Sequence, residues 1–204
     1  MISFRSASSL DLPRMLREKE NVAARRLELR DPHIVKLTNF SRSLRRRDLG
    51  HIPDFDPWDG GVNAKALFLY EKPGPKAFAS GFISRNNDDP TAEISFKFLQ
   101  LAGLERRDVV AWNVIPGWNG TMKVTSTELL KGLQCLEELT ELLVRLKVII
   151  LVGQNAARAK KLLEATLPKV AILQSYHPSP KVRACAPEKW KAIPTVWAQA
   201  KRYL

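Results

Sequence analysis

The sequence predicts an α/β domain built on a parallel β-sheet, and three observations carry this prediction. Four short apolar runs of strand length are spread along the chain. Segments with helical spacing of apolar residues lie between them, and strands that alternate with helices are typical of right-handed crossovers in a parallel sheet. The length of 204 residues suits one domain, because chains tend to divide beyond roughly 250 residues. We expect residues 51–204 to form the core and residues 1–50 a basic helical segment packed on it.

The amino-terminal segment is predicted to be helical and strongly basic. Apolar residues recur in it with an imperfect 3.6-residue period, at Leu10, Met15, Leu16, Val22, Leu27 and Leu29. A run of three arginines, 45–47, is either a solvated face or a stripe that follows phosphates at the edge of a binding groove. The stretch 1–5 has no extended apolar continuation, so we expect no export signal.

The helices and strands of the core are predicted from the lengths of the apolar segments and from the turn-forming residues between them. Residues 51–64 hold prolines, paired glycines and several aspartates, which predicts a loop leading into the first strand. Apolar runs too short for buried helices predict strands at Ala66–Leu69, Asp108–Trp112, Lys147–Val152 and Val170–Gln174. Helices are expected at Pro90–Ala102 with Asp89 as its N-cap, at Thr127–Arg145, at Asn155–Leu167, and at Glu188–Tyr203 with a break or kink at Pro194. The long connection 73–89 is predicted to be a functional loop.

Polar, turn-forming residues follow all four predicted strands. Glu71, Lys72 and Gly74 follow the first strand, and Asn113 ends the second. Gly153 follows the third strand, and His177 lies just beyond the fourth. Because open α/β sheets bind ligands at the carboxyl ends of their strands, we expect these residues to form one site.

Composition limits the classes of partner. Lys and Arg total 33 against 21 acidic residues, a net charge of +12, which predicts affinity for polyanions, nucleic acid before anionic membrane; the alternative is a merely basic surface. Cys135 and Cys185 stand far apart, which leaves too few ligands for a zinc site or an iron–sulfur cluster and favours a reducing, intracellular compartment. The longest apolar run is far shorter than the ~20 residues of a membrane span. Dinucleotide and P-loop glycine motifs are absent from the sequence, so we expect no cofactor.

Two residues at strand ends suit the recognition and release of a base. The amide of Asn113 can accept from N3–H and donate to O4 of a pyrimidine, which would favour uracil over cytosine; alternatively it ties down its own turn. A neutral His177 imidazole can donate to an oxygen that becomes anionic in the transition state, although a histidine in a loop is more often structural.

The turn after the first strand offers further candidates. Glu71 could orient a water molecule or stabilise an oxocarbenium ion. Lys72 could keep that carboxylate ionised, stabilise a departing anion, point into solvent or toward phosphate, or attack the sugar carbon to give a Schiff base. In the long connection, Phe78 or Phe82 could stack on a flipped base for ~1–3 kcal/mol, with core filling as the alternative.

Taken in order, these motifs resemble those of the uracil-DNA glycosylase superfamily over about residues 52–204. The matching segments are Glu71-Lys72-Pro73-Gly74, Phe82, Trp112-Asn113-Val114, Val152-Gly153 and His177-Pro178-Ser179-Pro180, with a similar lead-in at Pro53–Pro57 and Gly60-Gly61. The resemblance implies a three-layer α/β/α sandwich with a central four-stranded parallel sheet. It also implies a flipped-out base at the strand ends and hydrolysis of its N-glycosidic bond without a metal.

The resemblance assigns roles to residues of this sequence. Phe82 would stack on the base, Asn113 would read its edge, and His177 would contact its O2. The loop Pro178–Val182 would compress the DNA backbone and fill the vacated stack. The residues expected to contact DNA are therefore Arg85, Ser179, Pro180, Lys181, Val182 and Arg183.

Three positions depart from the family pattern. Lys72 stands where members usually carry Asp or Asn to position water, while Glu71 would match members that use a neighbouring glutamate. Gly74 stands where uracil-selective members place a tyrosine, so larger or modified bases should be admitted. Lys181 stands where an apolar wedge is expected, so Val182 or the lysine stem would substitute.

The sequence thus predicts a monomeric DNA glycosylase that removes uracil, a related damaged pyrimidine or a deaminated purine from DNA. The alternative is a nucleic-acid-binding protein that keeps the pocket but has lost hydrolysis, the outcome that Lys72 suggests. A variant that reacts covalently is a third possibility.

Overall fold

A computed structural model describes residues 11–204 of the chain. The stretch 1–5, where we expect no export signal, and Leu10 of the apolar stripe lie outside the described residues. Within residues 11–204, no helix is both long and apolar enough to cross a membrane.

Four parallel strands form the central sheet, in the spatial order β4-β2-β5-β6. Their bounds are β2 Ala66–Tyr70, β4 Val109–Asn113, β5 Val148–Val152 and β6 Ala171–Ser175. All four predicted strands are confirmed, each within one residue of its predicted ends. Every residue of β5 is buried, which is why the strand is an unbroken apolar run rather than an alternating one.

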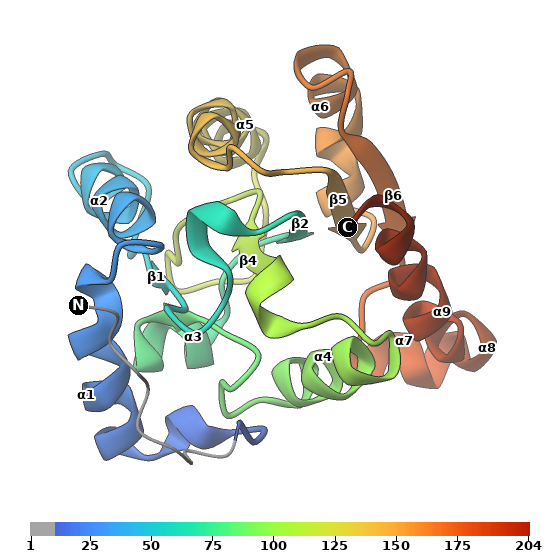
Figure 1. Cartoon of the computed structure of the whole chain (residues 1–204), viewed down its shortest axis with the longest axis horizontal. Coiled ribbons are helices and arrows are strands. Elements are labelled where there is room, and N and C mark those ends of the chain that lie inside the picture. The colour runs from blue at the N-terminus through green and yellow to red at the C-terminus, as the bar shows by residue number, and fades with distance from the viewer. Residues whose placement is uncertain (1–10) are drawn as a thin grey trace.

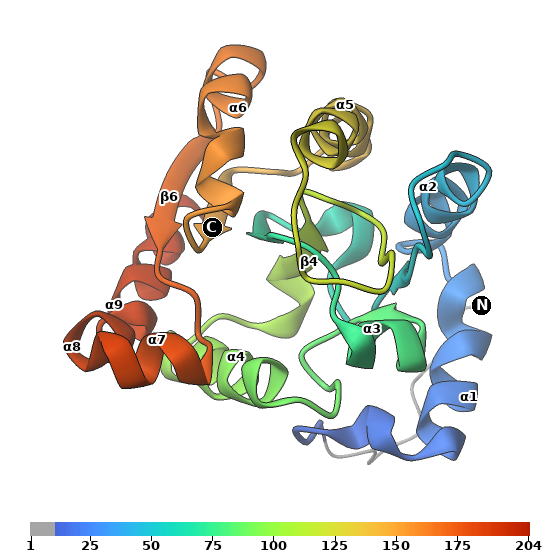
Figure 2. The same cartoon turned by 180° about the vertical axis from the view of Figure 1, so that it is seen from behind.

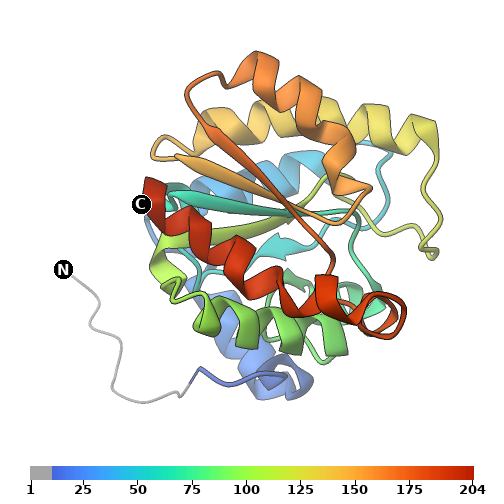
Figure 3. The ribbon, with the colours of Figure 1, turned by 90° about the vertical axis from the view of Figure 1, so that its right-hand side faces the viewer.

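Helices cover both faces of this sheet, as Figures 1 and 3 show. On one face, Leu67 and Leu69 of β2 pack with α2 (Val35–Leu44), α5 (Ser126–Leu142) and α6 (Lys160–Thr166). On the other face, Phe68 packs with α4 (Pro90–Leu101) and α9 (Ile193–Ala198). Alternate side chains of one strand therefore enter two separate cores, and the predicted three-layer α/β/α fold is confirmed.

The connection between β2 and α4 is more ordered than its predicted loop. It contains α3 (Pro75–Ser80) and β3 (Phe82–Ile83), which pairs in parallel with β1 (Asp54–Phe55). Pro75 opens α3 at a position that needs no backbone donor. Gly81 ends it with φ +81°, a conformation that disfavours other residues.

The carboxyl-terminal helical region is also divided more finely than predicted. The helix expected at Asn155–Leu167 begins as a 3₁₀ turn and continues as α6. The helix expected at Glu188–Tyr203 is broken before Pro194, because that proline lies in the first turn of α9. The other elements are α1 Lys19–Leu27, α7 Pro180–Cys185, α8 Pro187–Lys191 and the 3₁₀ turns Met15–Arg17, Glu28–Arg30, Gly61–Asn63, Arg106–Asp108, Ala156–Ala159 and Gln199–Tyr203.

A buried ion network fixes the basic amino-terminal segment to the core. The views in Figures 1 and 2 place α1 and α2 along one side of the molecule. The fully buried carboxylate of Asp56 accepts hydrogen bonds from Arg25 of α1 and from Arg106, and also from the backbone N–H of Trp58 at 2.9 Å. Burial alone would raise the pKa of Asp56, but the charges of Arg106 and Arg25 outweigh it and lower the pKa to about 2.

Candidate active site

A cavity of about 300 Å³ opens at the carboxyl ends of β2 and β4. Five residues predicted to belong to the site line it together, namely Lys72, Gly74, Arg85, Asn113 and His177. The walls also include residues of α3, α4 and the segment that follows β3. The strand ends therefore form one cavity, and its volume is at the small end of the range for ligand sites, about 300–1,000 Å³.

Asn113 presents an unpaired amide to this cavity. It is the last residue of β4, where its position is set by pairing with Tyr70 of β2. The residue is 4% exposed, and no described residue accepts a hydrogen bond from its Nδ2. A buried donor without a partner costs about 1–3 kcal/mol, so a bound ligand is the natural source of the missing acceptor.

His177 is held against the strand ends in the neutral form. Its ring lies edge-on to that of Tyr70, with the centroids 6.0 Å apart. Gly153 at the end of β5 has φ +91°, and a Cβ there would lie 3.2 Å from the Cβ of His177. Burial lowers the pKa of His177 to about 4, so its imidazole is an uncharged hydrogen-bond donor at neutral pH.

This low pKa predicts a pH dependence of stability. Because the unfolded chain takes up a proton near pH 6.5 and the folded chain only near pH 4, His177 should make the free energy of unfolding fall as the pH drops between these values. The slope due to one proton is at most about 1.4 kcal/mol per pH unit. Urea unfolding of wild type and His177→Gln at pH 7, 5.5 and 4.5 measures it, and the variant should lose less stability. Equal losses in the two proteins would contradict the shifted pKa.

Lys72 lies in the cavity wall, but its ammonium is fully engaged in structural contacts. The side chain is 0% exposed, and Nζ donates to Asn119 Oδ1 at 2.8 Å, to the carbonyl oxygen of Lys123 at 3.0 Å and to Glu128 Oε1 at 2.6 Å. Three acceptors use all three N–H donors of an ammonium, so no lone pair remains for nucleophilic attack. The predictions that Lys72 points into solvent or attacks the sugar do not fit this geometry.

We therefore expect Lys72 to act in stability rather than in covalent chemistry. Borohydride should trap no adduct between the wild-type protein and DNA. Glu128→Ala, which removes one acceptor from the buried ammonium, should lower the free energy of unfolding by about 1.5–3 kcal/mol in urea titrations. A trapped adduct that disappears in Lys72→Ala would contradict this assignment.

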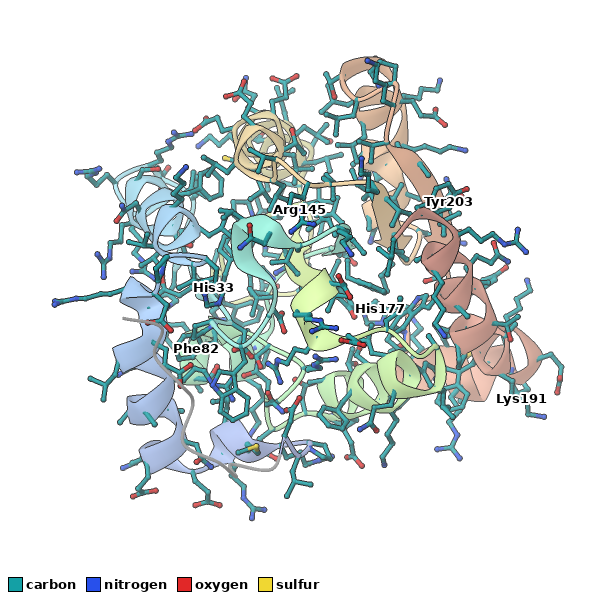
Figure 4. All side chains as sticks on the ribbon, viewed as in Figure 1. His33, Phe82, Arg145, His177, Lys191 and Tyr203 are labelled. Atoms are coloured by element: carbon teal, nitrogen blue, oxygen red, sulfur yellow. The ribbon has the colours of Figure 1, made fainter. Side chains whose placement is uncertain are left out.

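Glu71 and Phe82 do not lie where the sequence predicts. Tyr70 and Lys72 line the cavity and Glu71 does not, because successive side chains of an extended segment point in opposite directions. Phe82 is completely buried in β3, where it packs with Leu16 and Leu29. Figure 4 shows it well apart from His177, so its ring fills a core and is not available to stack on a ligand of the cavity.

The segment after His177 is a short helix rather than a loop. Ser179 is the N-cap of α7 and accepts a hydrogen bond from the N–H of Val182 at 3.4 Å, and Pro180 is the first helical residue. Val182 is half-buried, whereas Lys181 and Arg183 are exposed. The two basic side chains can therefore reach a partner that covers the cavity, while the expected role of Ser179 as a DNA contact competes with capping.

Two carboxylates in the cavity wall are not among the sequence-predicted site residues. Asp59 and Asp89 both line the cavity. Burial raises the pKa of Asp59 to about 6, against the opposing charge of Arg106, whose Nε lies 3.0 Å from Asp59 Oδ1. Asp89 is confirmed as the N-cap of α4, and burial raises its pKa too. No local pattern separates these aspartates from ordinary turn and capping residues, so only the tertiary structure identifies them.

A family of known proteins matches most of the described chain. The model of the family described as "Uracil DNA glycosylase superfamily" matches residues 59–201. A candidate uracil DNA glycosylase from Methanosarcina acetivorans, solved by solution NMR, aligns with a TM-score of 0.49 and 14% identity over 69% of this chain and 92% of that one. No curated protein sequence matches the chain significantly.

Proposed function

Because this chain belongs to the uracil DNA glycosylase superfamily, we propose that it is a DNA glycosylase, which binds a base flipped out of DNA and hydrolyses its N-glycosidic bond. One observation carries the proposal. The unpaired amide of Asn113 and the neutral imidazole of His177 line the same base-sized cavity at the strand ends. The bases proposed are uracil and related deaminated or damaged bases.

The proposed roles follow from the chemistry of the two side chains. Asn113 reads the edge of the bound base, since its amide offers a donor and an acceptor. His177 donates a hydrogen bond to the oxygen of the base that gains negative charge as the bond breaks. Asp59 and Asp89 replace Glu71 as the carboxylates able to orient water or face a developing oxocarbenium ion, because they line the cavity.

DNA binding in this proposal rests on charge. The net charge of +12 favours the phosphate backbone, and Lys181 and Arg183 lie exposed within six residues of His177. We propose that the protein acts as a monomer and grips the phosphates beside the flipped nucleotide with these side chains. The aromatic contact assigned to Phe82 is not part of this mechanism.

A specific observation also favours a second candidate function, binding without hydrolysis. Lys72, whose ammonium is held by Glu128, holds the position at which family members usually carry the water-positioning residue, and Glu71 is not among the residues that line the cavity. A protein of this kind would recognise a flipped base and leave its bond intact.

One experiment separates the two functions. Excess protein is incubated with duplex and single-stranded oligonucleotides that contain uracil, hypoxanthine or xanthine, and abasic sites are revealed by alkali. A glycosylase gives cleavage that is lost in Asn113→Ala while the variant unfolds at the temperature of wild type. Intact oligonucleotides that still shift in a gel would favour binding alone, and neither cleavage nor a shift would refute both.

A further inference from the structure

Arg85 is a buried arginine in the cavity wall, and no described carboxylate lies within ion-pair distance of its guanidinium. It follows β3 and is 9% exposed. No described residue forms an ion pair or a side-chain hydrogen bond with its guanidinium, and its Nε is both buried and unpaired. The guanidinium carbon lies 5.8 Å from the centre of the Phe96 ring, a cation–π contact that uses none of its N–H donors.

Two neighbouring arginines, the buried Arg25 and the half-buried Arg106, differ from Arg85 in this respect. Arg25 and Arg106 both donate to the carboxylate of Asp56. Burial lowers the pKa of Arg85 from its ordinary value and the charge of Arg106 lowers it further, and together they outweigh the opposing charges of Asp59, Asp11 and Asp56, so the fold destabilises this cation. Burying a charge without a partner costs several kcal/mol of folding free energy. A ligand site can keep such a charge because the bound ligand supplies the missing partner.

We propose that Arg85 is the residue that selects the base, and that the cavity takes a 6-oxopurine, such as hypoxanthine or xanthine, in preference to uracil. This inference rests on the proposed function and adds its substrate class. The guanidinium fork matches two adjacent acceptors, and the O6 and N7 atoms of an oxopurine present such a pair. A uracil ring has no second acceptor beside its O4.

The remaining groups of the wall fit the same base. Asp59 and Asp89 are acceptors for the ring N1–H that lies beside O6. A Cβ built on Gly74 meets no atom within 4 Å, so the wall leaves room on that side. Adenine presents an amino donor in place of O6 and is disfavoured by the cation. Guanine has the same O6 and N7 acceptors. It is excluded at the flipping step, because breaking an intact G·C pair costs more free energy than unpairing a damaged or mismatched base.

The test compares Arg85→Met with wild type in two independent measurements. In the excision assay, hypoxanthine and xanthine release should fall about 5–150-fold in the variant, and uracil release should change less. In thermal unfolding without DNA, free xanthine should raise the Tm of wild type and not that of the variant. Because the net effect of the fold on the Arg85 cation is unfavourable and no direct ion pair is lost, the variant without ligand should unfold at the wild-type temperature or above it. The matched variant Arg25→Met, which loses the ion pair with Asp56, should unfold lower.

Each outcome bears on one claim. Equal losses for all three bases, or a xanthine-induced Tm rise that survives in Arg85→Met or is absent from wild type, would overturn the selection by Arg85. Excision of hypoxanthine and xanthine that is unchanged in Arg85→Met would leave the proposed glycosylase standing and remove this inference. An Arg85-dependent Tm rise without any excision would support the inference and refute hydrolysis. Gly74→Tyr adds a second check, because a tyrosine at that wall should reduce oxopurine release more than uracil release.

Discussion

Replacing Asp56 with asparagine is expected to lower the free energy of unfolding by about 3–5 kcal/mol. The carboxylate is completely buried and compensates the charges of Arg25 and Arg106. Its removal leaves the buried guanidinium of Arg25 facing a neutral amide, whereas Arg106 keeps its ion pairs with Asp59 and Asp11. An uncompensated buried charge is among the costliest changes in a protein interior. The structural disturbance should be greatest where α1 contacts the core, because Arg25 is the residue of α1 that reaches Asp56.

Urea unfolding at pH 7 measures this loss, with Asp48→Asn as the matched control. Asp48 is fully exposed and lies 3.8 Å from Lys131, so its replacement should change stability by less than about 0.5 kcal/mol. The pH dependence gives a second signature. Because the pKa of Asp56 is depressed to about 2, its stabilisation is complete above about pH 4 and disappears as the pH falls toward 2, and Asp56→Asn should lack this step. A loss below 1 kcal/mol would show that the network is not important for folding.

The central sheet could be predicted from sequence because its strands are buried on both faces. Such strands are short runs of apolar residues bounded by turns, and this pattern can be recognised in the sequence alone. The Asp56 network could not be predicted in this way, since its partners lie 31 and 50 residues away along the chain. The short β1 and β3 strands were missed for a similar reason, because two residues cannot show a period.

The candidate site was predictable only where chain position determines side-chain direction. Asn113 and His177 end or follow strands of one parallel sheet, so they converge on the cavity as expected. Of the two catalytic candidates that follow the first strand, Lys72 lines the cavity and Glu71 does not, because successive side chains of an extended chain alternate in direction. Phe82 is aromatic and follows a glycine, which fits a stacking residue and a core residue equally well, and only the packing around β3 distinguishes them.

Under the proposed function, His177→Ala is expected to lower kcat for base release about 100–1,000-fold, the range found when one donor to a developing oxyanion is removed. The reason lies in the state of the imidazole. Since burial keeps it neutral well below pH 7, its contribution is a hydrogen bond that strengthens as the base gains charge, and not a proton transferred by an imidazolium. The loss should therefore appear in kcat rather than in KM.

Single-turnover excision at pH 6 to 8 tests this, with His33→Ala as the matched control. His33 is a partly buried imidazole whose Nε2 lies 2.8 Å from the carbonyl oxygen of Pro57, and it does not line the cavity. Its replacement should leave kcat within a few-fold of wild type. The wild-type rate should show no step near pH 6.5 that His177→Ala removes, because the folded imidazole does not titrate there. A loss below fivefold, or one confined to KM, would mean that His177 contributes to binding the base in its ground state, and another donor in the cavity would then have to stabilise the departing anion.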